Sequence, residues 1–213
     1  MRKLTRLLPL LLICSIHLLA PEVRADDPVV ITKGSLSGRF INYNFRIEGG
    51  NFALAGFSED GAVRAATCAP CRPGSVISGD GVFASIFGSG EVRINGVTHP
   101  TVYHEGDFSF RTESIELPPV PSDLVVKMPF TFTGVYRAYN TPGRNVAPIF
   151  QTDLRGQGVA TIKFRVTPFF LGSFHYEYEN ITYDFAPKAI LREPVVIREP
   201  WWQRFKLRML RKR

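Results

Sequence analysis

Apolar and polar side chains alternate along three segments of the chain, and this pattern constrains the fold more than any other feature. From Leu124 onward the apolar residues fall on even positions and the odd positions are mostly polar; the apolar set is Val126, Met128, Phe130, Phe132 and Tyr136. Residues 160–167 and 41–48 repeat the pattern. Because successive side chains of a strand point to opposite faces, each segment predicts a strand with one buried face, which is typical of antiparallel sheets.

Shorter strand candidates and turn residues fill most of the remaining chain. The candidates are residues 52–57, 81–87, 91–94, 97–103, 108–110 and 174–185. Asn95-Gly96 separates Ile94 from Val97, which predicts a two-residue hairpin whose turn needs positive φ angles. The 18 Gly and 16 Pro residues disfavour long helices. We expect an all-β fold, an antiparallel β-sandwich of roughly ten strands rather than a small barrel.

The N-terminal segment has the features of a signal peptide. Arg2, Lys3 and Arg6 precede an apolar run over residues 7–20, which is short for a membrane-spanning helix. Small residues at Val23-Arg24-Ala25 predict cleavage after Ala25; an uncleaved anchor is the alternative. We therefore expect a signal peptide at 1–25, a β-sandwich domain at 26–190 and a basic tail at 191–213. The expected location is periplasmic, cell-surface or extracellular.

The positive charge is concentrated at the two ends of the chain. Of the net charge of +7, residues 1–25 carry +3 and residues 198–213 carry +6, so the body carries −2. A specific nucleic-acid-binding face needs clustered positive charge on the fold itself. The sequence therefore predicts no specific nucleic-acid partner, and it leaves the oligomeric state open.

The C-terminal tail predicts a short amphipathic helix after Pro200. On a helical wheel Trp201, Trp202, Phe205 and Met209 share one sector, next to a basic sector. Aromatic residues beside basic ones are typical of helices that lie on anionic membranes. The residues expected to bind such a surface, or an acidic polysaccharide, are Trp201, Trp202, Arg204, Phe205, Lys206, Arg208, Arg211, Lys212 and Arg213. A solvated tail and a tail that binds nucleic acid are the alternatives.

Cys68-Ala69-Pro70-Cys71 is the most distinctive local motif. In an oxidising compartment the two cysteines predict a structural disulfide that fixes a loop. A thioredoxin-like role would need a helix after the first cysteine, which Pro73 and Gly74 disfavour. A zinc site with His99 and His104 is disfavoured because residues five apart on a strand point to opposite faces. We assign no metal and no cofactor.

No pattern in the sequence assigns a catalytic residue. His175, Glu177 and Glu179 share one face of a predicted strand, which we interpret as solvated, with Phe174, Tyr176 and Tyr178 buried. The chain contains no phosphate-binding loop before a helix, no nucleophile elbow and no zinc-protease motif.

Two function classes follow. The first is a noncatalytic envelope or matrix module that binds polysaccharide through a polar sheet face, for which the two candidates are Asn42, Asn44 and Arg46, and Thr131, Thr133 and Arg137. The second is a secreted hydrolase or metal-dependent enzyme with a site built from loops. A buried cluster that included His104 and His175 would favour this second class.

Four motifs occur in an order that resembles a group of exported bacterial β proteins, many of which end in a PEP-CTERM sorting signal. The motifs are residues 68–74 (CAPCRPG), 95–98 (NGVT), 129–134 (PFTFTG) and 156–161 (GQGVAT). The resemblance covers residues 34–185 and implies an exported β domain, but no activity and no catalytic residues. This chain departs from the group because Arg198-Glu199-Pro200 is followed by a basic segment and no apolar span.

Overall fold

The chain forms an all-β structure, which confirms the predicted fold class. The computed structural model describes residues 23–24, 27–39, 42–58, 61–64, 68–83, 91–94, 96–100, 103–139 and 146–199. Fourteen strands belong to one sheet, and β7 and β12 form a separate two-stranded sheet. The strands are β1 Val23–Arg24, β2 Val29–Ile31, β3 Lys33–Arg39, β4 Asn42–Gly49, β5 Phe52–Ser58, β6 Gly61–Val63, β7 Val76–Ser78, β8 Gly81–Phe83, β9 Glu91–Ile94, β10 Val97–Pro100, β11 Tyr103–Thr112, β12 Ser114–Glu116, β13 Asp123–Tyr139, β14 Phe150–Pro168, β15 Phe174–Asp184 and β16 Val195–Glu199.

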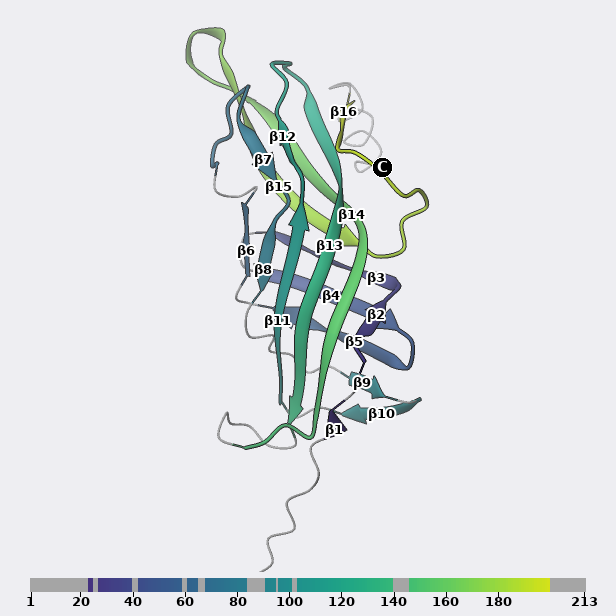
Figure 1. Cartoon of the computed structure of the whole chain (residues 1–213). Helices are drawn as coiled ribbons and strands as arrows, with labels where there is room; N and C mark the ends of the chain where they lie inside the picture. Colours follow the sequence, from purple (N-terminus) through teal and green to yellow (C-terminus); the bar gives the residue numbers. More distant parts are fainter. Residues whose placement is uncertain are drawn as a thin grey trace, which may run out of the picture.

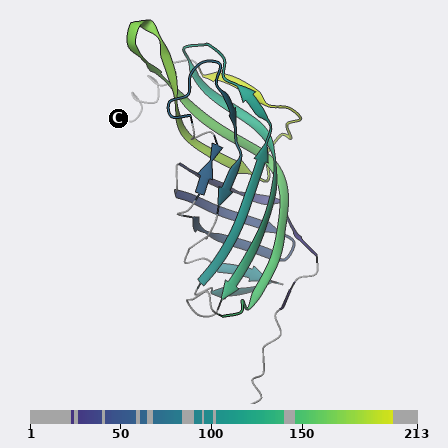
Figure 2. The ribbon, with the colours of Figure 1, turned by 60° about the vertical axis from the view of Figure 1, so that its left-hand side comes forward.

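The large sheet curls so that its two halves pack against each other. Its strand order is β10-β9-β5-β4-β3-β15-β14-β13-β11-β8-β6, and nearly all neighbours are antiparallel. Figure 1 shows β11, β13 and β14 running along the molecule while β3, β4 and β5 cross behind them, and Figure 2 shows the same crossing after rotation. The two layers of the expected sandwich are thus parts of one continuous sheet.

Aromatic rings fill the space between the two halves. The rings of Phe45 and Phe108 lie 6.3 Å apart, those of Tyr43 and Phe83 4.6 Å, and those of Phe52 and Tyr136 5.4 Å, each in an edge-to-face arrangement. These pairs join β4 and β5 to β8, β11 and β13 across the core. Edge-to-face pairs are favourable beyond the area that they bury, so the abundant Phe and Tyr residues stabilise the curl of the sheet.

The predicted alternation is confirmed in the long strands. Along β13 the even residues Val126, Met128, Phe130, Phe132 and Tyr136 are all buried. Tyr43, Phe45 and Ile47 are buried in β4, between exposed Asn42, Asn44 and Arg46. The Asn95-Gly96 hairpin is also confirmed, since Val97 pairs with Ile94 and Gly96 has φ +80. Of the candidate 97–103, residues 97–100 form β10, whereas Tyr103 begins β11.

The first half of β14 has no counterpart in the sequence analysis. β14 runs for 19 residues, although alternation predicted only its second half. The first half contains Gly156 and Gly158, which interrupt the apolar face. A Cβ on Gly158 would lie 2.0 Å from the Asp184 carbonyl oxygen, and one on Gly156 would lie 2.8 Å from the Phe185 ring. The two glycines therefore leave the space in which the end of β15 enters the core.

The segment after β15 crosses the outer face of the sheet. β15 pairs with one edge of β14, whereas β16 pairs with the free edge of β13 at Asp123–Lys127, so the chain after the core residue Phe185 passes across both strands. Val125 and Val159 point outward by alternation yet are only 8% and 5% exposed, which agrees with a segment that crosses this face. The sheet therefore extends into residues 191–213, which the sequence analysis set apart as a tail.

Near the N-terminus two short strands run parallel to β14. β1 pairs with Phe150 and Gln151, and β2 pairs with Leu154, Arg155 and Gly156. β1 lies within residues 1–25, so cleavage after Ala25 would remove it. Within the described ranges, no helix has the length and apolar character needed to span a membrane. The expected C-terminal helix lies outside the described residues.

Candidate functional site

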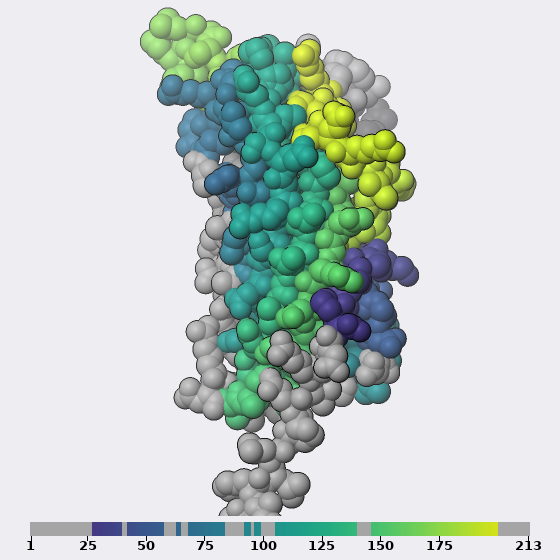
Figure 3. All heavy atoms as spheres, viewed as in Figure 1, coloured from purple at the N-terminus to yellow at the C-terminus, as the bar shows by residue number. Residues whose placement is uncertain are grey.

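A groove with a volume of about 880 Å³ lies beside the outward-facing residues of β11, β13 and β14. Its walls are β2 on one side and the crossing segment on the other, with Val30, Pro187, Ile190 and Leu191 as the main apolar contributors. Figure 3 shows these walls in purple and yellow beside the green surface of β14. The groove lies where β2, which pairs with β14 at Leu154–Gly156, and the segment after β15 both border the sheet.

The floor of the groove carries a regular row of polar side chains among apolar residues. Strand pairing places Arg111 opposite Thr131, and Thr131 opposite Gln157, so these three side chains form a row across β11, β13 and β14. Arg155 also lines the groove and is the next outward-facing residue of β14 beside Gln157. Arg111, Thr131, Arg155 and Gln157 are all exposed. The floor thus offers two guanidinium groups, an amide and a hydroxyl to a ligand, between apolar walls.

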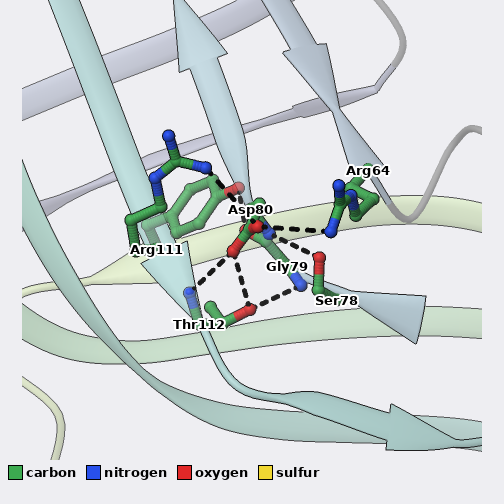
Figure 4. Close-up of polar contacts among 7 residues, drawn as sticks. Arg64, Ser78, Gly79, Asp80, Arg111 and Thr112 are labelled. Carbon is green, nitrogen blue, oxygen red and sulfur yellow. Dashed lines mark hydrogen bonds and ion pairs between the residues drawn. The ribbon is translucent and has the colours of Figure 1, made fainter. Parts of the chain in front are cut away.

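An acidic residue beside the groove holds Arg111. The Arg111 guanidinium lies 3.7 Å from the Asp80 carboxylate, whose other contacts are the Arg64 guanidinium at 3.9 Å and the Thr112 backbone N–H, which donates to it at 2.9 Å. Figure 4 shows Arg64 and Arg111 approaching Asp80 from different strands. The Asp80 side chain is only 18% exposed, and its backbone hydrogen bond fixes its position. A fixed carboxylate therefore orients Arg111 at the β11 end of this polar row.

The structure separates the two polar faces that the sequence offered. Thr131 lies in the groove, Thr133 is the outward neighbour of Arg155 by register, and Arg137 lies farther along β13. Arg137 donates to Gln151 at 3.1 Å and forms an ion pair with Asp107 at 3.2 Å. The outward residues Asn42, Asn44 and Arg46 of β4 belong to the other half of the sheet, where Phe57 of β5 pairs with Asn44 and is 38% exposed.

Cys68 and Cys71 lie at disulfide distance, with an S–S separation of 1.96 Å, as the sequence predicted. Cys71 is fully buried and exchanges two backbone hydrogen bonds with Tyr176 of β15, at 3.0 and 2.8 Å. Arg72 to Ser75 then form a turn in which Gly74 has φ +79, the value that a type II turn needs at this position. The motif therefore fastens the chain before β7 to β15 close to the loop that joins it to β14, at the base of the projecting part of this hairpin.

The histidines of the zinc and enzyme hypotheses lie on distant parts of the sheet. His104 pairs with Ala138, which pairs with Phe150 at the start of β14, whereas His175 pairs with Thr167 at its end. At about 3.3 Å per residue, roughly 50 Å of strand separates the two positions. His99 pairs with Val92 at the far edge of the sheet, and the two cysteines are bonded to each other. The backbone therefore brings none of these histidines together with the cysteines.

His175 lies on the outward face of β15, as predicted, but its side chain is only 14% exposed, so the predicted solvation is wrong for this residue. Its Nε2 lies 3.6 Å from a Glu177 carboxylate oxygen, and its ring contacts the Phe169 ring. Tyr176 and Tyr178 are buried, as expected. Glu179 sits at a bulge in the β14–β15 pairing and forms an ion pair with Arg165. In the described part of the chain, no three His, Cys, Asp or Glu residues form a group suited to a metal ion.

Two predicted regions cannot be placed. Nearly all of the signal segment lies outside the described residues. The same is true of the surface-binding set in the tail, which comprises Trp201, Trp202, Arg204, Phe205, Lys206, Arg208, Arg211, Lys212 and Arg213.

Sequence reasoning missed most of the groove. Arg155 and Gln157 alternate with Leu154, Gly156 and Gly158, and the two glycines removed the apolar signal that would have marked a strand. The outward position of Arg111 followed from Phe108 and Phe110, but nothing local showed that it faces β2 across a hollow.

No protein-family model, curated protein or solved structure matches this chain.

Proposed function

We propose that this chain is an exported, noncatalytic module of the cell envelope or extracellular matrix, and that it binds an acidic polysaccharide in the groove. The observation that carries the proposal is the row of Arg111, Thr131 and Gln157 with Arg155 beside it, between apolar walls. Guanidinium groups pair with carboxylates or sulfates in a fixed planar geometry, and amides and hydroxyls bond sugar hydroxyls. The apolar walls suit the C–H faces of sugar rings.

The small number of carboxylates that line the groove favours binding over hydrolysis. Glycoside hydrolysis usually requires two carboxyl groups on opposite sides of the scissile bond. Among the described residues that line the groove, Glu113 is the only acidic one. One carboxylate beside two arginines suits recognition of an anion and lacks the second group that the reaction needs.

Affinity electrophoresis of the exported protein tests this proposal. We expect a gel containing polygalacturonate to retard the protein, a gel containing neutral dextran to leave it unretarded, and retardation to fall as salt rises. Arg155→Gln and Thr131→Ala should each weaken retardation severalfold. The matched control is Lys163→Gln, because Lys163 points outward from the same strand beyond the groove. Equal weakening by the control, or no retardation by any acidic polysaccharide, would contradict the proposal.

The basic tail supports a second, electrostatic contact with the envelope. Residues 198–213 carry +6, and each basic residue near an anionic membrane contributes about 1 kcal/mol. We propose that the tail binds anionic lipid. Truncation after Glu199 should reduce salt-sensitive co-sedimentation with vesicles that contain phosphatidylglycerol; unchanged binding by the truncated chain would overturn this part.

A further inference from the structure

The β14–β15 hairpin ends in three consecutive exposed apolar side chains. Phe169, Phe170 and Leu171 are 65%, 77% and 89% exposed. In the ranges that the structure describes, no other three consecutive large apolar residues are exposed together. Figures 1 and 3 show this hairpin projecting beyond the body as the light-green loop. These three residues are called the apolar tip below.

The backbone holds the apolar tip in one shape. The Phe169 N–H donates to the Ser173 carbonyl oxygen at 2.8 Å, and the Ser173 hydroxyl donates to the Phe170 carbonyl oxygen at 2.6 Å. Leu171 adopts φ +57, a left-handed conformation that is unfavourable for a leucine, and Gly172 follows with φ +77. The Leu171 side chain is therefore displayed to solvent in a defined backbone conformation.

The base of the hairpin is firmly attached to the molecule. The Cys71 backbone pairs with Tyr176, and the Tyr176 hydroxyl donates toward the carbonyl oxygens of Pro118 and Val120 at 2.5 and 2.6 Å. Cys71 is also bonded to Cys68, so the disulfide loop is attached to β15 at the same point. The apolar tip thus stands on a fixed stalk, which reduces the entropy lost on binding.

We propose that the apolar tip inserts into the interfacial region of a lipid membrane. Its three side chains expose about 400 Å² of apolar surface, so two tips in contact would bury at most about 800 Å², less than a stable dimer usually needs. The tip is also convex, and two convex tips cannot cover one another. A lipid interface adapts to a convex apolar shape and accepts aromatic side chains at its boundary.

The charge next to the tip agrees with an anionic headgroup layer. A hollow of about 540 Å³ lies at the base of the tip and is lined by Phe169, Phe174, His175, Arg72 and two prolines, Pro70 and Pro73. Arg72 is exposed, and no acidic residue lines this hollow among those described. When the tip is inserted, the Arg72 guanidinium lies at the level of the lipid phosphates. This assignment is independent of the groove, which lies on the outer face of β11, β13 and β14.

Tryptophan fluorescence tests the insertion directly. The two native tryptophans are Trp201 and Trp202, so both are first replaced by Phe, and Phe170→Trp is then introduced into the full exported chain. With vesicles of phosphatidylcholine and phosphatidylglycerol, we expect the emission of this tryptophan to shift to the blue and to be quenched by brominated acyl chains. Val97→Trp, at an exposed site on β10, is the control and should show neither change. An unchanged spectrum at position 170 would overturn the proposal.

Binding measurements then separate the contributions of the tip and of Arg72. The triple variant Phe169→Ser, Phe170→Ser, Leu171→Asn should reduce co-sedimentation with these vesicles at least tenfold, whereas Val76→Ser with Val97→Ser should not. Asn is chosen because it tolerates the left-handed conformation. Arg72→Gln should weaken binding about fivefold, and only when phosphatidylglycerol is present. Equal vesicle binding by the triple variant and the parent, or loss of a dimer in the triple variant with no change in vesicle binding, would refute membrane insertion.

Discussion

Two kinds of residue are sensitive to change in this protein. The glycines of β14 leave no space for a side chain, and the buried tyrosines must keep their hydroxyl groups protonated. Gly158 has no side chain because the Asp184 backbone occupies the space that a Cβ would need. The Tyr183 hydroxyl, deep in the core, donates to the Gly79 carbonyl oxygen at 2.6 Å. Both residues join strands that are far apart in the sequence, so each is a sensitive point for the whole sheet.

Gly158→Ala should destabilise the fold strongly. The new Cβ would lie 2.0 Å from the Asp184 carbonyl oxygen, and relief requires β14 and β15 to separate. We expect a loss of about 3 kcal/mol of folding free energy, visible as a lower midpoint in urea unfolding. Gln157→Ala, at the exposed neighbour, should change the midpoint little. Equal midpoints for the Gly158 variant and the parent would show that β14 and β15 can separate locally without loss of folding free energy.

The buried tyrosines predict loss of stability at alkaline pH. Burial raises the pKa of Tyr136, Tyr178 and Tyr183 above its ordinary value of 10.0, and the same cause raises that of Tyr43 and Tyr176. The unfolded chain releases these protons near pH 10 while the folded chain retains them. Stability is therefore complete below pH 10 and falls above it, by about 1.4 kcal/mol per pH unit for each of Tyr136, Tyr178 and Tyr183, whose pKa is raised furthest.

A pH titration followed by tyrosinate absorbance and circular dichroism measures this effect. Ionisation of these five tyrosines should coincide with the loss of β structure. Full ionisation of all seven tyrosines in a chain that keeps its native spectrum would contradict the expected burial.

At the scale of elements, the Cys68–Cys71 loop and the crossing segment after β15 determine how strands are joined. The loop pairs with Tyr176 and fastens the base of the hairpin, and the crossing segment lets β16 add to β13. Both place a short segment against an element that is distant in sequence, and together they set the positions of the apolar tip and of the groove.

We expect the disulfide to be structural. In the exported protein, alkylation should find no reactive thiol before reduction and two after it. In the chain-entropy model a loop of this size contributes about 2 kcal/mol, so reduction should lower the unfolding midpoint modestly. The protein should not reduce insulin. Efficient insulin reduction that Cys68→Ser abolishes would overturn the structural interpretation.

At the scale of the whole molecule, one curled sheet carries a groove on its outer face and an apolar tip at one end. The long strands β13 and β14 connect the two features, because the groove lies over their middle and the tip follows the end of β14. If both proposals hold, the tip would attach the molecule to a membrane while the groove remained open to the matrix. The two proposals are tested by separate variants, so either can fail without the other.

Export itself is a prediction at this scale. The basic start, the short apolar run and the Val23-Arg24-Ala25 site predict a mature chain that begins at Asp26. The intact mass of the protein recovered from the periplasm or the medium should match residues 26–213. Recovery of a species that retains residues 1–25 in the membrane fraction would indicate an uncleaved anchor.

Local chemistry in the sequence determined the class of fold and many of its strands. The alternation in β4 and β13, the Asn95-Gly96 hairpin and the Cys68–Cys71 pair each depend on neighbours a few residues apart, so they were predictable. The continuity of the sheet, the pairing of β2 with β14 and the path of residues 185–194 depend on contacts between distant segments. Alternation says which face of a strand is buried, but not which strand lies beside it. The groove and the projection of the apolar tip arise from those distant pairings, and only the tertiary structure decided them.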